Sequence, residues 1–217
     1  MDRTNPLPAD LYCITAEEYS LGRSNIEVVR QWIAAGIKVI QYREKDKDMK
    51  KKYQECQIIR RLTKEAGATF IVNDDIDLAM MTEADGVHIG QEDFPLAAVR
   101  HLVGNHMIIG ISTHSPQQAR AAAIAGADYI GVGPIFKTST KKNVCLPVGL
   151  EYLQYVVNNI SLPFVAIGGI KETNIAEVVQ SGARCIAMVT EITKAPNMGK
   201  KISDLRKMIK NSMEENR

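Results

Sequence analysis

The chain has 217 residues, of which 45% are hydrophobic and 24% are charged, and its formal net charge is +2. This composition is typical of a globular protein. The small net charge argues against a nucleic-acid-binding protein, because such proteins normally carry a basic stripe on their surface. Neither a signal-peptide pattern nor an apolar run of membrane-spanning length is present, so we expect a cytoplasmic protein.

Short apolar runs alternate with stretches of helical periodicity along the whole chain. After a lead of ten residues, expected to be flexible, the apolar runs predict eight strands. The predicted strands are 11–15, 39–42, 69–72, 86–89, 108–112, 129–132, 164–167 and 185–189. Helical spacing, caps and terminating glycines predict helices over 26–35, 49–66, 76–82, 115–126 and 200–212, and two more that begin at Pro95 and Asn174.

This alternation predicts a single (β/α)8 TIM-type barrel that occupies the whole chain, 1–217. A doubly wound open sheet is the alternative, but the G-x-G-x-x-G turn expected after its first strand is missing. The long polar segment from Gly133 to Gly149 is predicted to be a functional loop, because structureless loops of this length are uncommon in compact domains. Its lysines and Thr-Ser-Thr run favour a lid over bound phosphate.

Two of the predicted strands lead into acidic residues. The strand 69–72 continues into Asn73, Asp74 and Asp75, and the strand 86–89 leads to Asp93. Because parallel strands of a βαβ unit end at the same rim, Asp74 and Asp93 are expected to be neighbours, and such a carboxylate pair suits Mg²⁺. The alternative is that Asp74 or Asp75 caps the next helix and that Asp93 caps the helix opened by Pro95.

Polar groups also follow the other strands. Gln41, Arg43 and Lys45 occupy alternate positions, which face one side of an extended chain. This pattern fits a solvated edge strand, but in a barrel it would direct an amide and two cations into the mouth. The pair Gly168-Gly169 ends the seventh strand without Cβ groups, where backbone N–H groups can approach an anion. The predicted rim therefore offers two anion sites.

Motifs in the same order along nearly the whole chain together resemble the thiamine-phosphate synthase family. They are QYREK (41–45), NDD (73–75), DGVHIGQED (85–93), GISTHS (110–115), DYIGVGPIFKTSTKK (128–142) and AIGGI (166–170). The resemblance implies a Mg²⁺-dependent transferase that joins 4-amino-2-methyl-5-hydroxymethylpyrimidine diphosphate to a thiazole phosphate, giving thiamine phosphate and pyrophosphate. It also implies a dissociative displacement, in which the thiazole nitrogen captures the pyrimidine cation after the diphosphate leaves.

The resemblance also implies roles for individual residues. Positions that hold the pyrimidine diphosphate are matched by Gln41, Arg43, Lys45, Asn73, Ser112 and Lys141. Positions that hold the thiazole phosphate are matched by Thr138, Thr140, Gly169, Val189 and Thr190. The family's Mg²⁺ ligands are matched by Asp74 and Asp93. The expected catalytic residues are Arg43, Lys45, Ser112 and Lys141. The substrate-binding set is completed by Tyr42, Glu44 and Ser139, although Glu44 is expected to be a structural partner rather than a base.

Two other functions fit the same fold. A thiazole tautomerase would use a histidine near the end of the sixth strand, where this chain has Gly133-Pro134. A non-catalytic metabolite-binding barrel would have lost one anion site, whereas both look intact. We expect small-molecule substrates and neither nucleic acid nor a membrane as partner, and we leave a homo-oligomer open. His88 is expected to be a buried structural histidine, and Trp32 and Tyr129 are expected only to pack.

Overall fold

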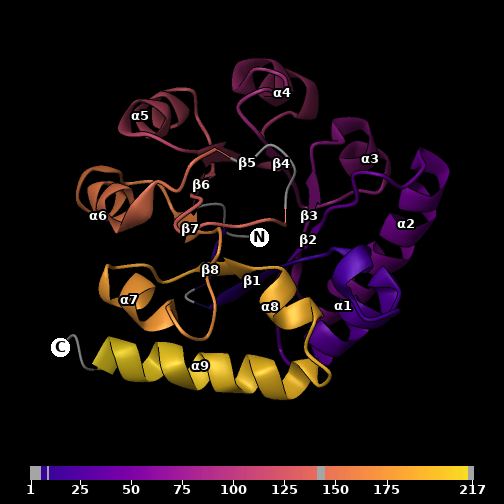
Figure 1. Ribbon diagram of the computed structural model, residues 1–217. Helices are drawn as coiled ribbons and strands as arrows, with labels where there is room; N and C mark the ends of the chain where they lie inside the picture. Colours follow the sequence, from indigo (N-terminus) through magenta and orange to yellow (C-terminus); the bar gives the residue numbers. More distant parts are fainter. Residues whose placement is uncertain (1–5, 9, 141–144, 215–217) are drawn as a thin grey trace.

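The chain forms a closed barrel of eight parallel strands in the order β1 to β8, surrounded by helices, which confirms the predicted TIM-type fold (Figure 1). The computed structural model describes residues 6–8, 10–140 and 145–214. The strands are β1 (Leu11–Ile14), β2 (Val39–Tyr42), β3 (Thr69–Asn73), β4 (Gly86–Ile89), β5 (Ile108–Thr113), β6 (Tyr129–Val132), β7 (Phe164–Ala166) and β8 (Ile186–Met188). Within the described ranges, no helix combines the length and hydropathy that crossing a membrane requires.

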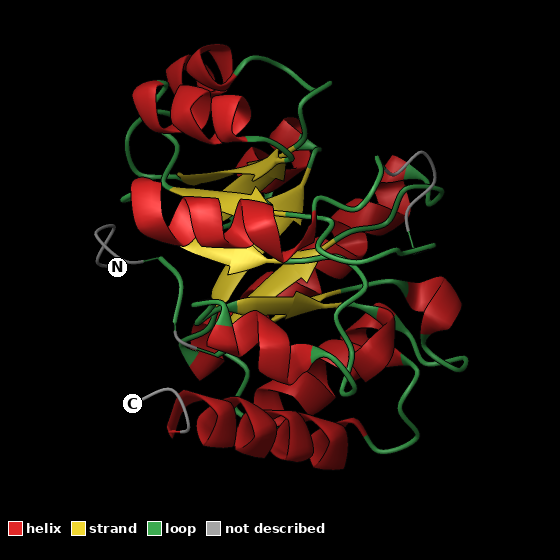
Figure 2. Cartoon of the chain, turned by 60° about the vertical axis from the view of Figure 1, so that its left-hand side comes forward, coloured by secondary structure: helices red, strands yellow, loops and turns green. Residues whose placement is uncertain are grey.

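The helices form an outer ring around the barrel, as the side view in Figure 2 shows. A short 3-10 helix, η1 (Glu17–Tyr19), follows β1. The α-helices are α1 (Asn25–Ala34), α2 (Met49–Ala66), α3 (Ile76–Met81), α4 (Leu96–Val103), α5 (Pro116–Ile124), α6 (Gly149–Asn159), α7 (Ile175–Gln180), α8 (Thr190–Thr193) and α9 (Met198–Glu214). Because all eight strands run in one direction, their carboxyl ends meet at one rim.

The pairing of β1 with both β2 and β8 closes the sheet and divides the core into two layers. Tyr12 lies opposite Val39 on one side and Ala187 on the other. Successive side chains of a strand point to opposite faces, so one set fills the barrel and the other meets the helices. Tyr12 and Tyr129 belong to the inner cluster, whereas Trp32 is fully buried in the outer one.

The amino-terminal segment is held against the barrel where the structure describes it. Leu7 is only 5% exposed and packs on the inner cluster. Asp10 forms an ion pair with Arg206 of α9, at 2.6 Å. We expected a flexible lead over the first ten residues; the described part of it is instead anchored by one apolar and one ionic contact.

Three elements were not placed from the sequence: η1, α6 and α8. Helix α6 has a regular apolar face, with Tyr152, Leu153 and Val156 buried. Its N-cap is Val148, which makes no side-chain cap hydrogen bond, so the usual polar signal for a helix start is missing. By contrast, the predicted cap of α5 is present, because the Ser115 side chain accepts a hydrogen bond from the Gln118 backbone.

Glycine makes room inside the barrel for an aromatic ring. Gly110 of β5 pairs with Tyr129 of β6 in the strand register. A Cβ atom at Gly110 would overlap the Tyr129 ring, and one at Gly131 would lie 3.4 Å from the His88 ring. The narrow interior therefore accepts the Tyr129 ring only because β5 carries glycine at position 110, whereas a Cβ atom at Gly131 would only contact the His88 ring.

We predict that Gly110→Ala lowers the free energy of unfolding by about 1–3 kcal/mol, because the added methyl group overpacks the barrel interior against Tyr129. Urea denaturation measures this change. The matched control is Gly199→Ala in α9, where the nearest atom would lie 3.6 Å away. The control should be neutral or stabilising by up to about 1 kcal/mol. Equal stability of Gly110→Ala and wild type would contradict the packing.

Candidate active site

The predicted site residues lie at or beyond the carboxyl ends of the strands. Gln41 and Ser112 are the next-to-last residues of β2 and β5, and Asn73 is the last residue of β3. The remaining members lie in the segments that follow the strands: Arg43 and Lys45 after β2, Thr138, Ser139 and Thr140 after β6, Gly169 after β7, and Val189 and Thr190 after β8. Lys141 lies outside the described residues. Active sites of this fold occupy that rim.

An ion pair joins the ends of β2 and β3. The Lys45 ammonium group contacts the Asp74 carboxylate, with 49% and 20% of the two side chains exposed. Asp74 has a φ of 61°, in the left-handed region that non-glycine residues seldom adopt. Such strain costs about 1–3 kcal/mol and tends to occur at functional sites.

The neighbouring carboxylate of Asp75 faces a different partner. It forms an ion pair at 2.8 Å with Lys52 of α2, a lysine that is only 7% exposed. The backbone N–H of Asp74 donates to the carbonyl oxygen of His88 on β4, at 2.9 Å. These two contacts hold the turn after β3 and leave Asp74 directed to Lys45.

Asp93 lies in the exposed segment between β4 and α4. Its Oδ2 atom accepts a hydrogen bond from the Gly90 backbone, at 2.6 Å. The same segment is tied to β5, because the Gln91 side-chain amide donates to the Ser112 carbonyl oxygen at 2.7 Å. The segments after β3, β4 and β5 are therefore connected by hydrogen bonds around one side of the rim.

The geometry argues against the capping alternative for both aspartates. The N-cap residue of α3 is Asp75, and that of α4 is Pro95. Neither helix has a side-chain cap hydrogen bond. Asp74 and Asp93 are thus not occupied as helix caps.

The carboxylates of Asp74 and Asp93 suit Mg²⁺ better than they suit a metal ion that is bound by protein ligands alone. In the described ranges, no group of three or more His, Cys, Asp and Glu side chains is arranged to hold a metal ion. This excludes a zinc-type cage among those residues, since such a cage needs three or four protein ligands. Mg²⁺ needs only one or two carboxylates, because water and substrate phosphate supply the other oxygens. Asp74 and Asp93 offer one carboxylate each, from the segments after β3 and β4.

A chain of hydrogen bonds crosses the barrel interior. The Gln41 amide nitrogen donates to the Tyr12 hydroxyl at 3.0 Å, and the Tyr12 and Tyr129 hydroxyls are 2.9 Å apart. The Tyr129 hydroxyl lies 2.9 Å from Nδ1 of His88, whose Nε2 lies 2.9 Å from the Ser112 hydroxyl. His88 is buried, as predicted. Tyr129, however, does more than pack, because it links His88 to Tyr12.

Two members of the predicted substrate-binding set point away from the mouth. The Tyr42 hydroxyl donates to Glu55 of α2, at 2.8 Å, and its ring belongs to the outer core. The Glu44 carboxylate accepts a hydrogen bond from the Glu17 backbone at 2.9 Å. Burial raises the pKa of the Tyr42 phenol and of the Glu44 carboxyl. Both side chains therefore support the rim from outside, which for Glu44 agrees with the structural role expected.

An ionic cluster completes this outer support. Lys47 forms ion pairs with Glu17 at 2.7 Å and with Glu55 at 2.6 Å. Asn25 of α1 donates to the same Glu55 carboxylate at 3.0 Å. The cluster anchors the segment after β2, which carries Arg43 and Lys45, to α1 and α2.

The opposite side of the rim is built from the segments after β6, β7 and β8. The backbones of Ile135 and Phe136 donate to the carbonyl oxygens of Ile167 and Gly168, both at 2.9 Å. Gly168 and Gly169 have φ values of 99° and 65°. A Cβ atom at Gly169 would lie 2.6 Å from the Lys137 carbonyl oxygen. The glycine pair is therefore required by close packing as well as by its left-handed backbone.

The segments after β6 and β8 carry hydroxyl groups. The Thr138 hydroxyl donates to that of Thr140, at 3.3 Å, and Thr190 begins the short helix α8 directly after β8. The backbone of Glu172, after β7, donates to the Glu191 carboxylate of α8 at 3.3 Å. A short extra helix after β8 is the element that often contributes to phosphate binding in this fold, although its brevity hid it from the sequence analysis.

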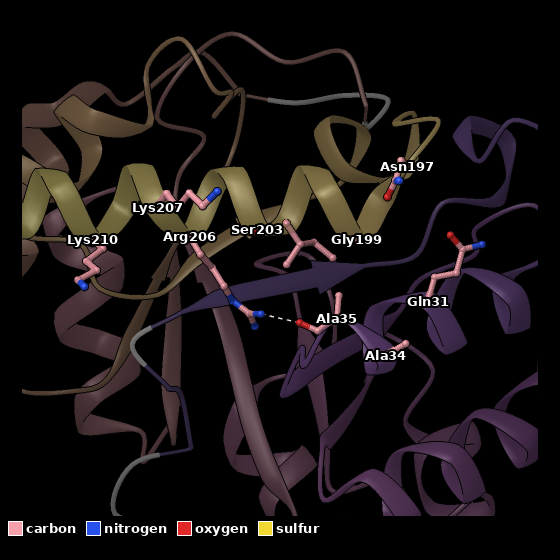
Figure 3. Close-up of a pocket in the computed structure, with 10 residues that line it drawn as sticks. Gln31, Ala34, Ala35, Asn197, Gly199, Ser203, Arg206, Lys207 and Lys210 are labelled. Atoms are coloured by element: carbon pink, nitrogen blue, oxygen red, sulfur yellow. Dashed lines mark hydrogen bonds between the residues drawn. The ribbon is translucent and has the colours of Figure 1, made fainter.

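A groove lies elsewhere, on the outer wall between α1 and α9 (Figure 3). It has a volume of about 740 Å³, and Lys207 and Lys210 of α9 lie along it. Its third cation, Arg206, already donates to the carbonyl oxygens of Ala35 at 2.5 Å and of Gly36 at 3.0 Å. None of the predicted site residues lines it, so the strand ends remain the better candidate.

Comparison with known proteins identifies the family. Residues 11–192 match a family model described as thiamine monophosphate synthase. The thiamine-phosphate synthase of Pelotomaculum thermopropionicum is 68% identical over 203 residues, which cover 94% of this chain and 93% of the relative. That of Lawsonia intracellularis is 56% identical, with 94% of each chain covered. A solved thiamine phosphate pyrophosphorylase from Pyrococcus furiosus superimposes with a TM-score of 0.86 at 34% identity, covering 97% of this chain and 98% of its own. The chain therefore belongs to the thiamine monophosphate synthase family.

Proposed function

We propose that the protein is a thiamine-phosphate synthase, a transferase that joins 4-amino-2-methyl-5-hydroxymethylpyrimidine diphosphate to a thiazole phosphate and releases pyrophosphate. The observation that carries the proposal is that the two sides of one rim carry chemically different groups, which we interpret as two anion sites. The ends of β2 to β5 carry cations and a carboxylate pair, whereas the ends of β7 and β8 carry a glycine turn and a short helix. One reaction partner is a diphosphate and the other a monophosphate, which matches this division.

The diphosphate is proposed to bind at the ends of β2 to β5. Arg43 and Lys45 would neutralise its negative charge, and Asn73 and Ser112 would donate hydrogen bonds. The ion pair between Lys45 and Asp74 supports this role, because it places a cation beside the carboxylate that is proposed to bind Mg²⁺. Lys141 is proposed to contribute a further cation from the segment after β6.

Asp74 and Asp93 are proposed to hold Mg²⁺, which when bound would neutralise charge on the diphosphate. One carboxylate oxygen of Asp93, Oδ2, accepts a hydrogen bond from the Gly90 backbone. The other carboxylate oxygen does not take part in this hydrogen bond. The ion pair with Lys45 would orient the Asp74 carboxylate before substrate arrives. The protein would thus contribute only part of the coordination shell, as is usual for this ion.

The thiazole phosphate is proposed to bind at the ends of β6 to β8. Gly169, Val189 and Thr190 would surround the phosphate from the glycine turn and α8, and the hydroxyls of Thr138, Ser139 and Thr140 would approach from the opposite segment. The hydrogen bonds of Ile135 and Phe136 to the end of β7 support a shared site, since they bring these segments together.

The reaction is proposed to be a dissociative displacement. Departure of the diphosphate would leave an electron-rich pyrimidine cation, which the thiazole nitrogen then captures. Such a reaction requires charge neutralisation and alignment of two substrates more than proton transfer. The proposed residues supply both, and none of them needs to act as a general base.

Small molecules would be the only reaction partners, and a cytoplasmic location stays a prediction. Incubation of the purified protein with both substrates and Mg²⁺, followed by assays for thiamine phosphate and pyrophosphate, tests the proposal.

We predict that excess chelator abolishes turnover and that added Mg²⁺ restores it. Asp93→Asn should lower kcat/KM by at least about tenfold, since it weakens a metal ligand while keeping an oxygen that can accept from Gly90. The matched control is Glu92→Gln, which removes the same charge one residue away on the exposed surface. Full activity in chelator, or equal losses in both variants, would contradict the metal assignment.

We also predict that the two anion sites can be perturbed separately. Lys45→Met should raise the KM for the pyrimidine diphosphate about tenfold or more, because a charged contact to phosphate is lost. Thr190→Ala should raise the KM for the thiazole phosphate several-fold to about tenfold, because a hydroxyl is lost. Each variant should leave the other KM within about twofold. Steady-state kinetics with one substrate varied at a time distinguishes this outcome from a single shared site, which predicts that both KM values rise together.

A further inference from the structure

The hydrogen-bonded chain inside the barrel joins two proposed substrate contacts that lie on different strands. Gln41 stands at one end, on β2, and Ser112 at the other, on β5. Between them lie Tyr12, Tyr129 and His88, from β1, β6 and β4. Tyr12 and Tyr129 are at most 1% exposed, so water cannot readily replace these hydrogen bonds. The hydrogen-bonded chain is therefore a fixed feature of the core.

The direction of each hydrogen bond follows from the donor at one end. The Gln41 amide nitrogen can only donate, so the Tyr12 oxygen accepts from it. A hydroxyl has one proton, and a buried proton left without an acceptor is costly, so the Tyr12 hydroxyl donates to Tyr129. For the same reason the Tyr129 hydroxyl donates to Nδ1 of His88.

This order fixes the protonation of the histidine ring. If Nδ1 of a neutral His88 accepts a proton from Tyr129, the ring proton lies on Nε2. Nε2 then donates to the Ser112 oxygen, 2.9 Å away. Burial raises the pKa of both tyrosine phenols well above its usual range, which agrees with hydroxyls that keep their protons.

The consequence appears at the two ends. Because the Ser112 oxygen accepts from His88, its own proton is available to donate to another group. Because the Gln41 nitrogen donates to Tyr12, the amide oxygen of Gln41 is the atom outside the chain. One end therefore offers a donor and the other an acceptor, and a reversed chain would exchange both properties.

We propose that Tyr12 and Tyr129 are positioning residues that fix Ser112 as a hydrogen-bond donor and Gln41 as an acceptor toward the pyrimidine diphosphate. This inference rests on the proposed function. A donor at Ser112 matches an anionic phosphate oxygen, and an acceptor at Gln41 matches the amino group of an aminopyrimidine. The reversed chain would present the wrong group to both parts of the substrate. Neither tyrosine needs to touch the substrate.

The proton order can be tested without turnover. In two-bond ¹H–¹⁵N spectra of the full-length protein, a protonated ring nitrogen is distinguished from an unprotonated one by its ¹⁵N shift. We expect wild-type His88, assigned by loss of its signals in His88→Asn, to carry its proton on Nε2. Tyr129→Phe should produce a mixture of both tautomers, because Nδ1 loses its donor. A wild-type ring protonated on Nδ1 would overturn the inference even if the protein is a synthase.

Kinetics then tests whether the order matters to the substrate. Tyr12→Phe and Tyr129→Phe should each lower kcat/KM for the pyrimidine diphosphate about tenfold, with the KM for the thiazole phosphate within about twofold. The double variant should be no worse than either single variant, because one break already separates the two ends. Multiplied losses in the double variant, or an unchanged kcat/KM in both single variants, would overturn the proposal.

The protein offers a matched control for these variants. Tyr152→Phe removes another buried tyrosine hydroxyl, which donates to Thr113 at 2.7 Å outside the hydrogen-bonded chain. Its effect on unfolding in urea should resemble that of Tyr129→Phe, while its kcat/KM and the His88 spectrum should match wild type. A similar loss of kcat/KM in Tyr152→Phe would mean that general loosening of the barrel, rather than proton order, is responsible. Absence of coupling activity in the wild type would refute the synthase assignment and leave the spectroscopic result to stand by itself.

Discussion

Closure of the barrel through the pairing of β1 with β8 is the constraint on which the rest of the structure depends. A closed parallel sheet has no free edge, and it brings eight strand ends to one rim. It also encloses an interior just wide enough for side chains. Gly110 admits the ring of Tyr129 into that space, and the ring of His88 lies beside Gly131. Polar atoms of these rings are then out of reach of water and must bond to each other.

Much of this arrangement could be predicted because it depends on local pattern. The strand ends at Asn73 and Ser112 follow from short apolar runs bounded by polar residues, and parallel pairing then places them on one rim. The cap at Ser115 is an equally local signal, and it is present. Helix α6 escaped because its start has no polar cap, and α8 because a helix of four residues has too little periodicity to be recognised.

What could not be predicted depends on contacts between distant segments. Tyr12 and Tyr129 are 117 residues apart in the sequence, and their hydroxyls meet only because of the register of eight strands. Alternation correctly separates Gln41, which faces the barrel, from Tyr42, which faces Glu55, but it does not identify either partner. The φ of 61° at Asp74 is likewise a property of the folded turn, held by the ion pair of Asp75 with Lys52.

The rim is supported in two ways that fit a reaction governed by charge and alignment. Outside the barrel, Lys47 and its two glutamates hold the segment that carries Arg43 and Lys45 by ionic contacts. Inside, neutral hydroxyls and an imidazole fix the orientation of Ser112 and Gln41 by hydrogen bonds. In the proposed reaction, the departing diphosphate requires dipoles and charges that are already oriented, because reorientation during the reaction would add to the barrier. The ionic cluster restrains where the charges lie, and the buried chain determines which way the dipoles point.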